Sequence, residues 1–208
     1  MLPFAKIMTG ILLCLLLPGC AGQVPTRSGF LDNYSTLQQP FGRRDCAALP
    51  PARPIRYQAV AIAPIRFADS VATRLSHAEQ KRLAGILTQA LRQKLTPPMS
   101  QPTGASATLR IRAAITAINE SRPALNLLTT LALFLPLDTG GVSVELEALD
   151  PVTGRRIAAM SAGQSGSPFW FRSSFQRFGH AEKGLPLLAA EFHHLLTAAG
   201  SDAAPADQ

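Results

Sequence analysis

The strongest constraint on the fold is a capped amphipathic helix, predicted over residues 77–95. Ser76 and Glu79 have the spacing of a capping box, in which each side chain accepts a hydrogen bond from the backbone amide of the other residue. The apolar residues that follow lie at helical spacing on one face: Leu83, Ile86, Leu87, Ala90, Leu91 and Leu95. Pro97 and Pro98 end the helix. Because such a helix must bury its apolar face, the chain must supply a second layer.

Strand patterns on both sides of this helix supply that layer. Residues 59–65 are small and aliphatic and predict a central strand, buried on both faces and bounded by a proline. Residues 108–118 alternate between apolar and polar side chains and predict a strand with one exposed face. Its apolar side is Leu109, Ile111, Ala113, Ile115 and Ala117. Residues 142–148 and 155–163, joined by a turn at residues 150–154, predict a hairpin.

A second helix is predicted over residues 185–196, with Pro186 in its first turn. Its apolar face is Leu185, Leu188, Phe192 and Leu195. The order strand, helix, strand, strand, strand, helix predicts a single α+β domain over residues 57–198, with a mixed four-stranded sheet and both helices on one face. The polar, Ala-rich tail at residues 199–208 is expected to be disordered.

The first twenty residues have the composition of a targeting segment. Lys6 supplies a positive charge, and the apolar run over residues 7–17 is about half as long as the roughly 20 residues of a membrane-spanning helix. Leu17-Pro18-Gly19-Cys20 resembles the lipobox of bacterial lipoproteins. The resemblance implies that the signal peptide, residues 1–19, is removed and that acyl chains on Cys20 anchor the protein in a membrane.

Composition and charge agree with an envelope protein. The chain has 208 residues, of which 47% are hydrophobic and 16% charged, so it can bury a core. Its net charge of +7 predicts attraction to anionic lipid or polymer, while export argues against nucleic acid as a partner. Ala21 follows the acylated residue. By resemblance to the sorting of enteric lipoproteins, the lack of Asp there implies the outer membrane, with the domain facing the periplasm.

Residues 20–56 are predicted to form a flexible lipidated tether, because they are rich in Pro, Arg, Gln and Ser and show little periodicity. Within them, residues 28–37 read SGFLDNYSTL. This motif resembles the opening signature of a family of bacterial envelope lipoproteins of unknown function, and the resemblance continues at residues 57–65 and 150–154. It implies a location and a fold, and it carries no catalytic residue.

Two stretches are candidates for contact with a membrane or a partner. Residues 124–137 are strongly apolar but too short to span a bilayer, so they form either a contact segment or a buried connecting helix. Residues 167–179 combine aromatic residues with arginine and form either an interface or core packing beneath the last helix. The candidate contact residues are Leu127, Leu128, Leu131, Phe134, Leu135, Phe169, Trp170, Phe171, Arg172 and Phe175.

One motif suggests an enzyme. Residues 135–140, Leu-Pro-Leu-Asp-Thr-Gly, resemble the active-site loop of retroviral-type aspartic peptidases, in which a homodimer brings two such Asp residues together. A peptidase acting through Asp138 is therefore the alternative function. The main prediction is a non-enzymatic binding or envelope-assembly module that contacts an envelope protein or polymer and holds no metal or cofactor.

The other charged and sulfur-containing residues have structural interpretations. Glu145 and Glu147 are predicted to face Arg155 or Arg156 across the hairpin. Two further arginines in a strand, Arg110 and Arg112, could bind an anion or form a solvated sheet face. His193 and His194 are adjacent on a helix and so are poor metal co-ligands. Cys46 has no intramolecular partner, so it either pairs between chains or stays a thiol in the tether.

Overall fold

A computed structural model of the chain describes residues 23–39, 43–52, 55, 57–96, 108–133, 139–150 and 152–197. Several predicted features lie outside these residues: the signal peptide, Cys20, Phe134, Leu135, Asp138 and the tail at 199–208. No helix in the part that is described is both long and apolar enough to cross a membrane.

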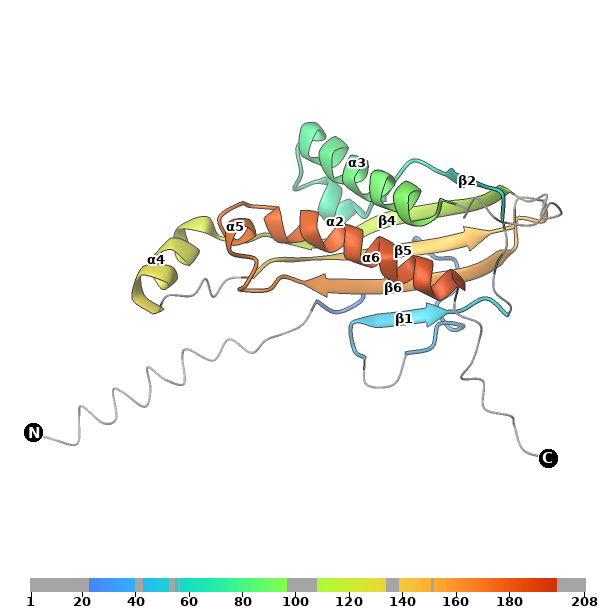
Figure 1. Cartoon of the computed structure of the whole chain (residues 1–208), viewed down its shortest axis with the longest axis horizontal. Helices are drawn as coiled ribbons and strands as arrows, with labels where there is room; N and C mark the ends of the chain where they lie inside the picture. The colour runs from blue at the N-terminus through green and yellow to red at the C-terminus, as the bar shows by residue number, and fades with distance from the viewer. Residues whose placement is uncertain are drawn as a thin grey trace, which may run out of the picture.

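A mixed six-stranded sheet forms the centre of the fold (Figure 1). Its strands are β1 (Cys46–Leu49), β2 (Ala59–Ile62), β3 (Arg66–Phe67), β4 (Thr108–Asn119), β5 (Gly141–Leu149) and β6 (Arg156–Ser165). The order is β1-β6-β5-β4-β2, and β3 also pairs with β4. β2 and β3 run parallel to β4, and the other neighbours are antiparallel. The predicted α+β class and mixed sheet are confirmed, but the sheet has two more strands than predicted.

Two strands of the sheet were not predicted from the sequence, and one predicted strand has a different position. β1 lies within the segment predicted as a flexible tether, and β3 has two residues, too few to show an alternating pattern. The strand predicted over residues 59–65 ends at Ile62 and lies at the sheet edge, so its predicted central position was wrong. Pro64, which follows, cannot donate a ladder hydrogen bond, and proline is confined to such edges.

The helix α3 (His77–Lys94) confirms the first prediction. The Ser76 hydroxyl accepts a hydrogen bond from the Glu79 amide at 3.4 Å, and the Glu79 carboxylate accepts one from the Ser76 amide at 2.8 Å. Its apolar face is buried against the sheet and the second long helix, α6 (Gly179–Thr197). α3 and α6 lie on the same face of the sheet, as predicted (Figure 1).

The helix α6 begins six residues before its predicted start, at Gly179 rather than Leu185. Pro186 is therefore inside the helix, and its predicted place in the first turn was wrong. Small residues bring the added turns close to the sheet, since a Cβ built on Gly184 would lie 2.8 Å from a Val142 methyl carbon. Glycine is a poor helix former, so the sequence pattern gave no sign of these turns.

The strand β4 departs from strict alternation near its end. Its register with β5 shifts between Ile115 and Ala117, and beyond this bulge Ile118, rather than Ala117, is buried in the core. The predicted apolar side of this strand is thus correct as far as Ile115. The turn at residues 150–154 forms as predicted, with Gly154 at a φ of 67°, a conformation that favours glycine.

Three shorter helices complete the described chain: α2 (Asp69–Ala72), α4 (Pro123–Leu133) and α5 (Phe171–Ser174). α4 connects the end of β4 to the start of β5, and α5 follows the end of β6. Both therefore lie at the same end of the sheet, where α4 projects beyond the strands (Figure 1). The turn between β5 and β6 lies at the opposite end.

Candidate functional site

The face of the sheet opposite α3 and α6 is crossed by residues 23–39, which we call the strap. The strap is held by Glu145 in the middle of β5, a residue with 0% of its surface exposed. Ser28 donates to this carboxylate from its backbone amide at 3.0 Å and from its hydroxyl at 2.8 Å. The Tyr34 hydroxyl lies 2.9 and 3.1 Å from the two carboxylate oxygens. One buried acid therefore binds both halves of the SGFLDNYSTL motif.

Tyr34 closes the motif into a compact loop. Its hydroxyl oxygen also accepts hydrogen bonds from the Gly29 amide at 2.8 Å and the Leu31 amide at 3.4 Å. Gly29 has a φ of 84°, which favours glycine, and Leu31 is buried. Burial, and then the hydrogen bond to Glu145, raises the pKa of Tyr34, so the hydroxyl keeps its proton to donate.

The strap begins with a clamp across three strands at the end of the sheet near α4. The backbone amide of Gln23 donates to the Ser165 hydroxyl at 2.6 Å, and the Gln23 side-chain amide donates to the Ser143 hydroxyl at 3.0 Å. The Asn119 side chain donates to the Gln23 side-chain oxygen at 2.6 Å. Gly163 permits this close approach, because a Cβ there would lie 2.4 Å from the Gln23 carbonyl oxygen. The position of the chain is thus fixed three residues after Cys20.

Glu147, two residues after Glu145, binds arginine instead. Its carboxylate lies 2.7 Å from an Arg112 nitrogen and 2.9 Å from an Arg156 nitrogen. The predicted pairing of Glu147 across the hairpin is confirmed for Arg156, whereas Glu145 holds the strap. Because each buried carboxylate already binds several donors, the two do not form a pair poised for acid–base chemistry.

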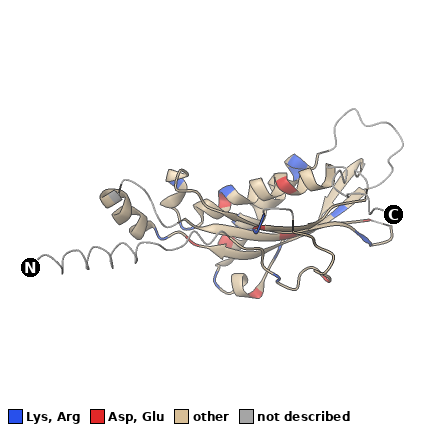
Figure 2. Cartoon of the chain, turned by 90° about the horizontal axis from the view of Figure 1, so that it is seen from below, with Lys and Arg blue, Asp and Glu red and all other residues tan. Residues whose placement is uncertain are grey.

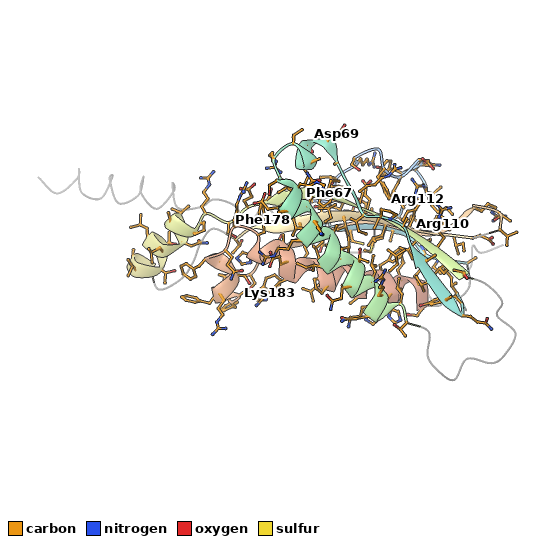
Figure 3. The ribbon with its side chains drawn as sticks, turned by 90° about the horizontal axis from the view of Figure 1, so that it is seen from above. Phe67, Asp69, Arg110, Arg112, Phe178 and Lys183 are labelled. Carbon is orange, nitrogen blue, oxygen red and sulfur yellow. The ribbon has the colours of Figure 1, made fainter. Side chains whose placement is uncertain are left out.

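The two arginines of β4 on this face differ in exposure, because Arg112 is half-buried beside Glu147. Arg110 is exposed, and Arg112 lies over the Phe30 ring at 5.1 Å as well as beside Glu147. With Arg66 they line a concavity of about 300 Å³. Figure 3 shows Arg110 and Arg112 toward the end of the sheet away from α4, whereas Phe178 and Lys183 lie toward the α4 end.

The helix α4 has its apolar face turned outward. Leu127, Leu128 and Leu131 are 55%, 64% and 73% exposed, and with Ala124 they have the i, i+3, i+4, i+7 spacing of a single face. The inward side is polar: Asn126 is buried and donates to the Ser174 carbonyl of α5 at 2.7 Å. This is the reverse of an ordinary surface helix, which buries its apolar face. The interpretation of residues 124–137 as a buried connecting helix was therefore wrong for the described part.

Exposed apolar residues concentrate at this end of the sheet. Nine large hydrophobic residues of the described chain are exposed, and seven of them belong to the start of the strap, α4 and the segment before and within α5. These seven, which we call the apolar end, are Val24, Leu125, Leu127, Leu128, Leu131, Phe169 and Phe171. α4 itself carries no charged residue (Figure 2). Complete burial of one such side chain is worth about 1.5–3 kcal/mol, so the apolar end is suited to contact with an apolar phase or partner.

A family model described as "Protein of unknown function (DUF3313)" matches residues 26–192. The chain belongs to this family. The DUF3313 region begins inside the strap and ends in α6, so it includes both Ser28 and Tyr34. The match agrees with the predicted resemblance to a family of unknown function. A search of curated proteins found no match.

Solved structures match this DUF3313 protein at low similarity. It resembles the PelC dodecamer from Paraburkholderia phytofirmans, with 13% identity over 74% of this chain and 96% of that chain and a TM-score of 0.46. A candidate lipoprotein from Caulobacter crescentus CB15 has 11% identity over 69% and 92%, with a TM-score of 0.38. Protein XCC0632 from Xanthomonas campestris, of DUF330, has 11% identity over 72% and 90%, with a TM-score of 0.44.

The aromatic stretch of the DUF3313 domain divides between surface and core. Among its predicted contact residues, Phe169, Phe171 and Arg172 are exposed, and Trp170 and Phe175 are half-buried. Trp170 stacks on His180 at 5.9 Å between ring centroids, with the Lys183 ammonium 5.6 Å from the Trp170 ring. Phe178 is buried in the core. Each of the two interpretations of this stretch therefore holds for part of it.

One buried pair of polar side chains, Ser174 and His180, was not predicted from the sequence. The Ser174 hydroxyl lies 3.0 Å from His180 Nε2, a geometry that can activate a nucleophile. The exposed fractions of these residues are 0% and 1%, so Ser174 has no side open to a substrate. The neighbouring Gly166 leaves room for the ring, since a Cβ there would lie 2.4 Å from His180 Nδ1. The pair therefore joins α5 to α6, and no sequence motif marks it.

Cys46 is a buried thiol in β1 and has no disulfide partner in the described chain. Burial raises its pKa to about 12, so almost no thiolate forms at neutral pH. Of the two alternatives for Cys46, burial disfavours pairing between chains and favours an unpaired thiol, which lies in β1 rather than in a flexible tether.

We expect Cys46 of the native protein to resist maleimide at pH 8 and to react within minutes in concentrated urea. A Val152→Cys variant supplies the control, because Val152 is 90% exposed and should be labelled without urea. Mass spectrometry counts the labels. Equal labelling of Cys46 with and without urea would contradict its place in the sheet.

Proposed function

We propose that this DUF3313 protein is a lipoprotein of the outer membrane, anchored by acyl chains on Cys20, with its domain facing the periplasm. The observation that carries the proposal is the distance between the lipobox and the fold. Gln23, three residues after Cys20, is already clamped to three strands. A lipobox cysteine placed directly before a folded domain is suited to hold that domain against a membrane.

The proposed role is that of a non-enzymatic binding or envelope-assembly module. The buried side chains that could take part in catalysis support this role, because their contacts hold parts of the fold together. Glu145 holds the strap, Glu147 binds two arginines and His180 contacts Ser174. The proposed partner is an envelope protein or polymer, and the net charge of +7 favours an anionic one.

The test of this function is replacement of Cys20. The mature chain with Cys20→Ala, exported through an ordinary secretory signal, is expected to be released from outer membranes by an alkaline carbonate wash, which removes peripherally bound protein, whereas the native protein is expected to remain. Cys46→Ala is the matched control, since it removes the other cysteine of the mature chain and should leave the protein in the membrane. Intact mass should show acylation of the native protein and of this control. Retention of the Cys20→Ala chain after the carbonate wash, or a native protein without acyl mass, would refute the proposal.

A further inference from the structure

We infer that the apolar end is a membrane-docking surface, and that α4 lies in the headgroup region of the same bilayer that holds the acyl chains. This inference deepens the proposed function and rests on acylation of Cys20. It assigns one occupant, a lipid surface, to the outward face of α4.

The position of the anchor carries the inference. A fully extended chain advances at most about 3.3–3.6 Å per residue, so Cys20 lies within about 11 Å of Gln23. Gln23 is bonded to Asn119, the last residue of β4, and to Ser165, the last residue of β6. α4 begins four residues after Asn119. The bilayer that receives the acyl chains must therefore lie close to the end of the sheet from which α4 projects (Figure 1).

The surface at this end has the chemistry of a membrane-interface contact. The outward side of α4 is apolar, and Phe169 and Phe171 add exposed aromatic side chains at the same end of the sheet. The cationic residues Arg122, Arg172 and Lys183 are exposed in the neighbouring segments. Interfacial helices bury an apolar face by about 5–10 Å and are attracted to anionic headgroups by nearby cations.

Docking also fixes the orientation of the domain. β5 runs from the apolar end to the turn at residues 150–154, so this turn points away from the bilayer. The hydrogen bond from Asn126 to α5 then keeps the polar inward side of α4 attached to the domain. The leucines on the outward side of α4 contact lipid.

The experiment uses the full acylated protein in vesicles of phosphatidylethanolamine and phosphatidylglycerol. An environment-sensitive dye is attached to Leu128→Cys or, as a second position, Leu131→Cys; Val152→Cys at the far turn is the matched control. All three positions are exposed, at 64%, 73% and 90%, so the substitutions remove few contacts. Dye at the two α4 positions should show blue-shifted emission and at least twofold quenching by brominated lipids, while dye at Val152→Cys should show neither.

Three other outcomes would each overturn docking of α4 on the bilayer. Acylated protein whose α4 dyes behave like the Val152→Cys dye would overturn docking and leave the anchor intact. A blue shift without quenching by brominated lipids would mean that α4 is covered by protein, such as a second copy, and would also overturn it. A protein whose intact mass shows no acyl chains would refute the proposed function and, with it, this inference.

Discussion

Replacing Glu145 with alanine is expected to lower the free energy of unfolding by about 3–5 kcal/mol, because it removes a fully buried acid that binds the strap. The Ser28 amide, the Ser28 hydroxyl and the Tyr34 hydroxyl would all lose their acceptor. Urea unfolding followed by circular dichroism measures the change. Hydrogen exchange should also show faster exchange of the strap amides, since their attachment to β5 is lost.

Two further substitutions accompany Glu145→Ala, one as a control and one as a test of its coupling to Tyr34. Asp32→Ala changes an exposed acid of the same motif and should alter stability by less than about 0.5 kcal/mol. Tyr34→Phe should cost about 1–2 kcal/mol, and its effect should be smaller when Glu145 is already alanine, because only the hydrogen bonds from the Gly29 and Leu31 amides are then lost. A loss below about 1 kcal/mol in Glu145→Ala, or additive effects of the two substitutions, would contradict the role of Glu145 as the strap's anchor.

The second large effect is expected on the outward face of α4. Changing Leu127, Leu128 and Leu131 together to glutamine should weaken vesicle binding of the released Cys20→Ala chain by about 100-fold or more. Burying the exposed part of each leucine contributes roughly 1–2 kcal/mol, and three of them exceed the ~2.7 kcal/mol that corresponds to 100-fold. Vesicle flotation measures the binding.

Folding stability provides the control for that variant. The three side chains are more than half exposed, so the triple substitution should change the free energy of unfolding by less than about 1 kcal/mol. Leu187→Gln, on α6 and 46% exposed, should leave vesicle binding unchanged. Unchanged binding of the triple variant, or a loss of stability above about 2 kcal/mol, would show that these leucines serve the fold rather than a membrane contact.

Elements with local signals were predictable from the sequence. The start, end and buried face of α3 depend on a capping box, prolines and a periodic pattern, all within about 20 residues. The hairpin of β5 and β6 likewise depends on alternation and on one turn. The start of α6 was not predictable, because Gly179 and Gly184 oppose helix formation locally. Gly179 is favoured by close contact with Ser173 of α5, and Gly184 by close contact with the sheet.

The strap was not predictable, because its stability depends on distant partners. Ser28 and Glu145 are 117 positions apart, and Gln23 and Ser165 are 142 apart. Alternation along β5 correctly placed Glu145 on one face of the strand but did not show that a separate segment buries it. For α4, composition identified an apolar stretch, whereas the direction of its leucines depends on Asn126 reaching Ser174 in another helix.

In the proposed arrangement, the strap places the anchored end of the chain beside the apolar end, and the sheet stands on the bilayer. Energy transfer from dyes on the acylated protein to an acceptor in the lipid headgroups tests it directly. β5 has nine residues and spans roughly 30 Å at ~3.3 Å per residue. We therefore predict strong transfer from Leu131→Cys and much weaker transfer from Val152→Cys. Equal transfer from the two positions, or stronger transfer from Val152→Cys, would contradict the proposed orientation of the domain.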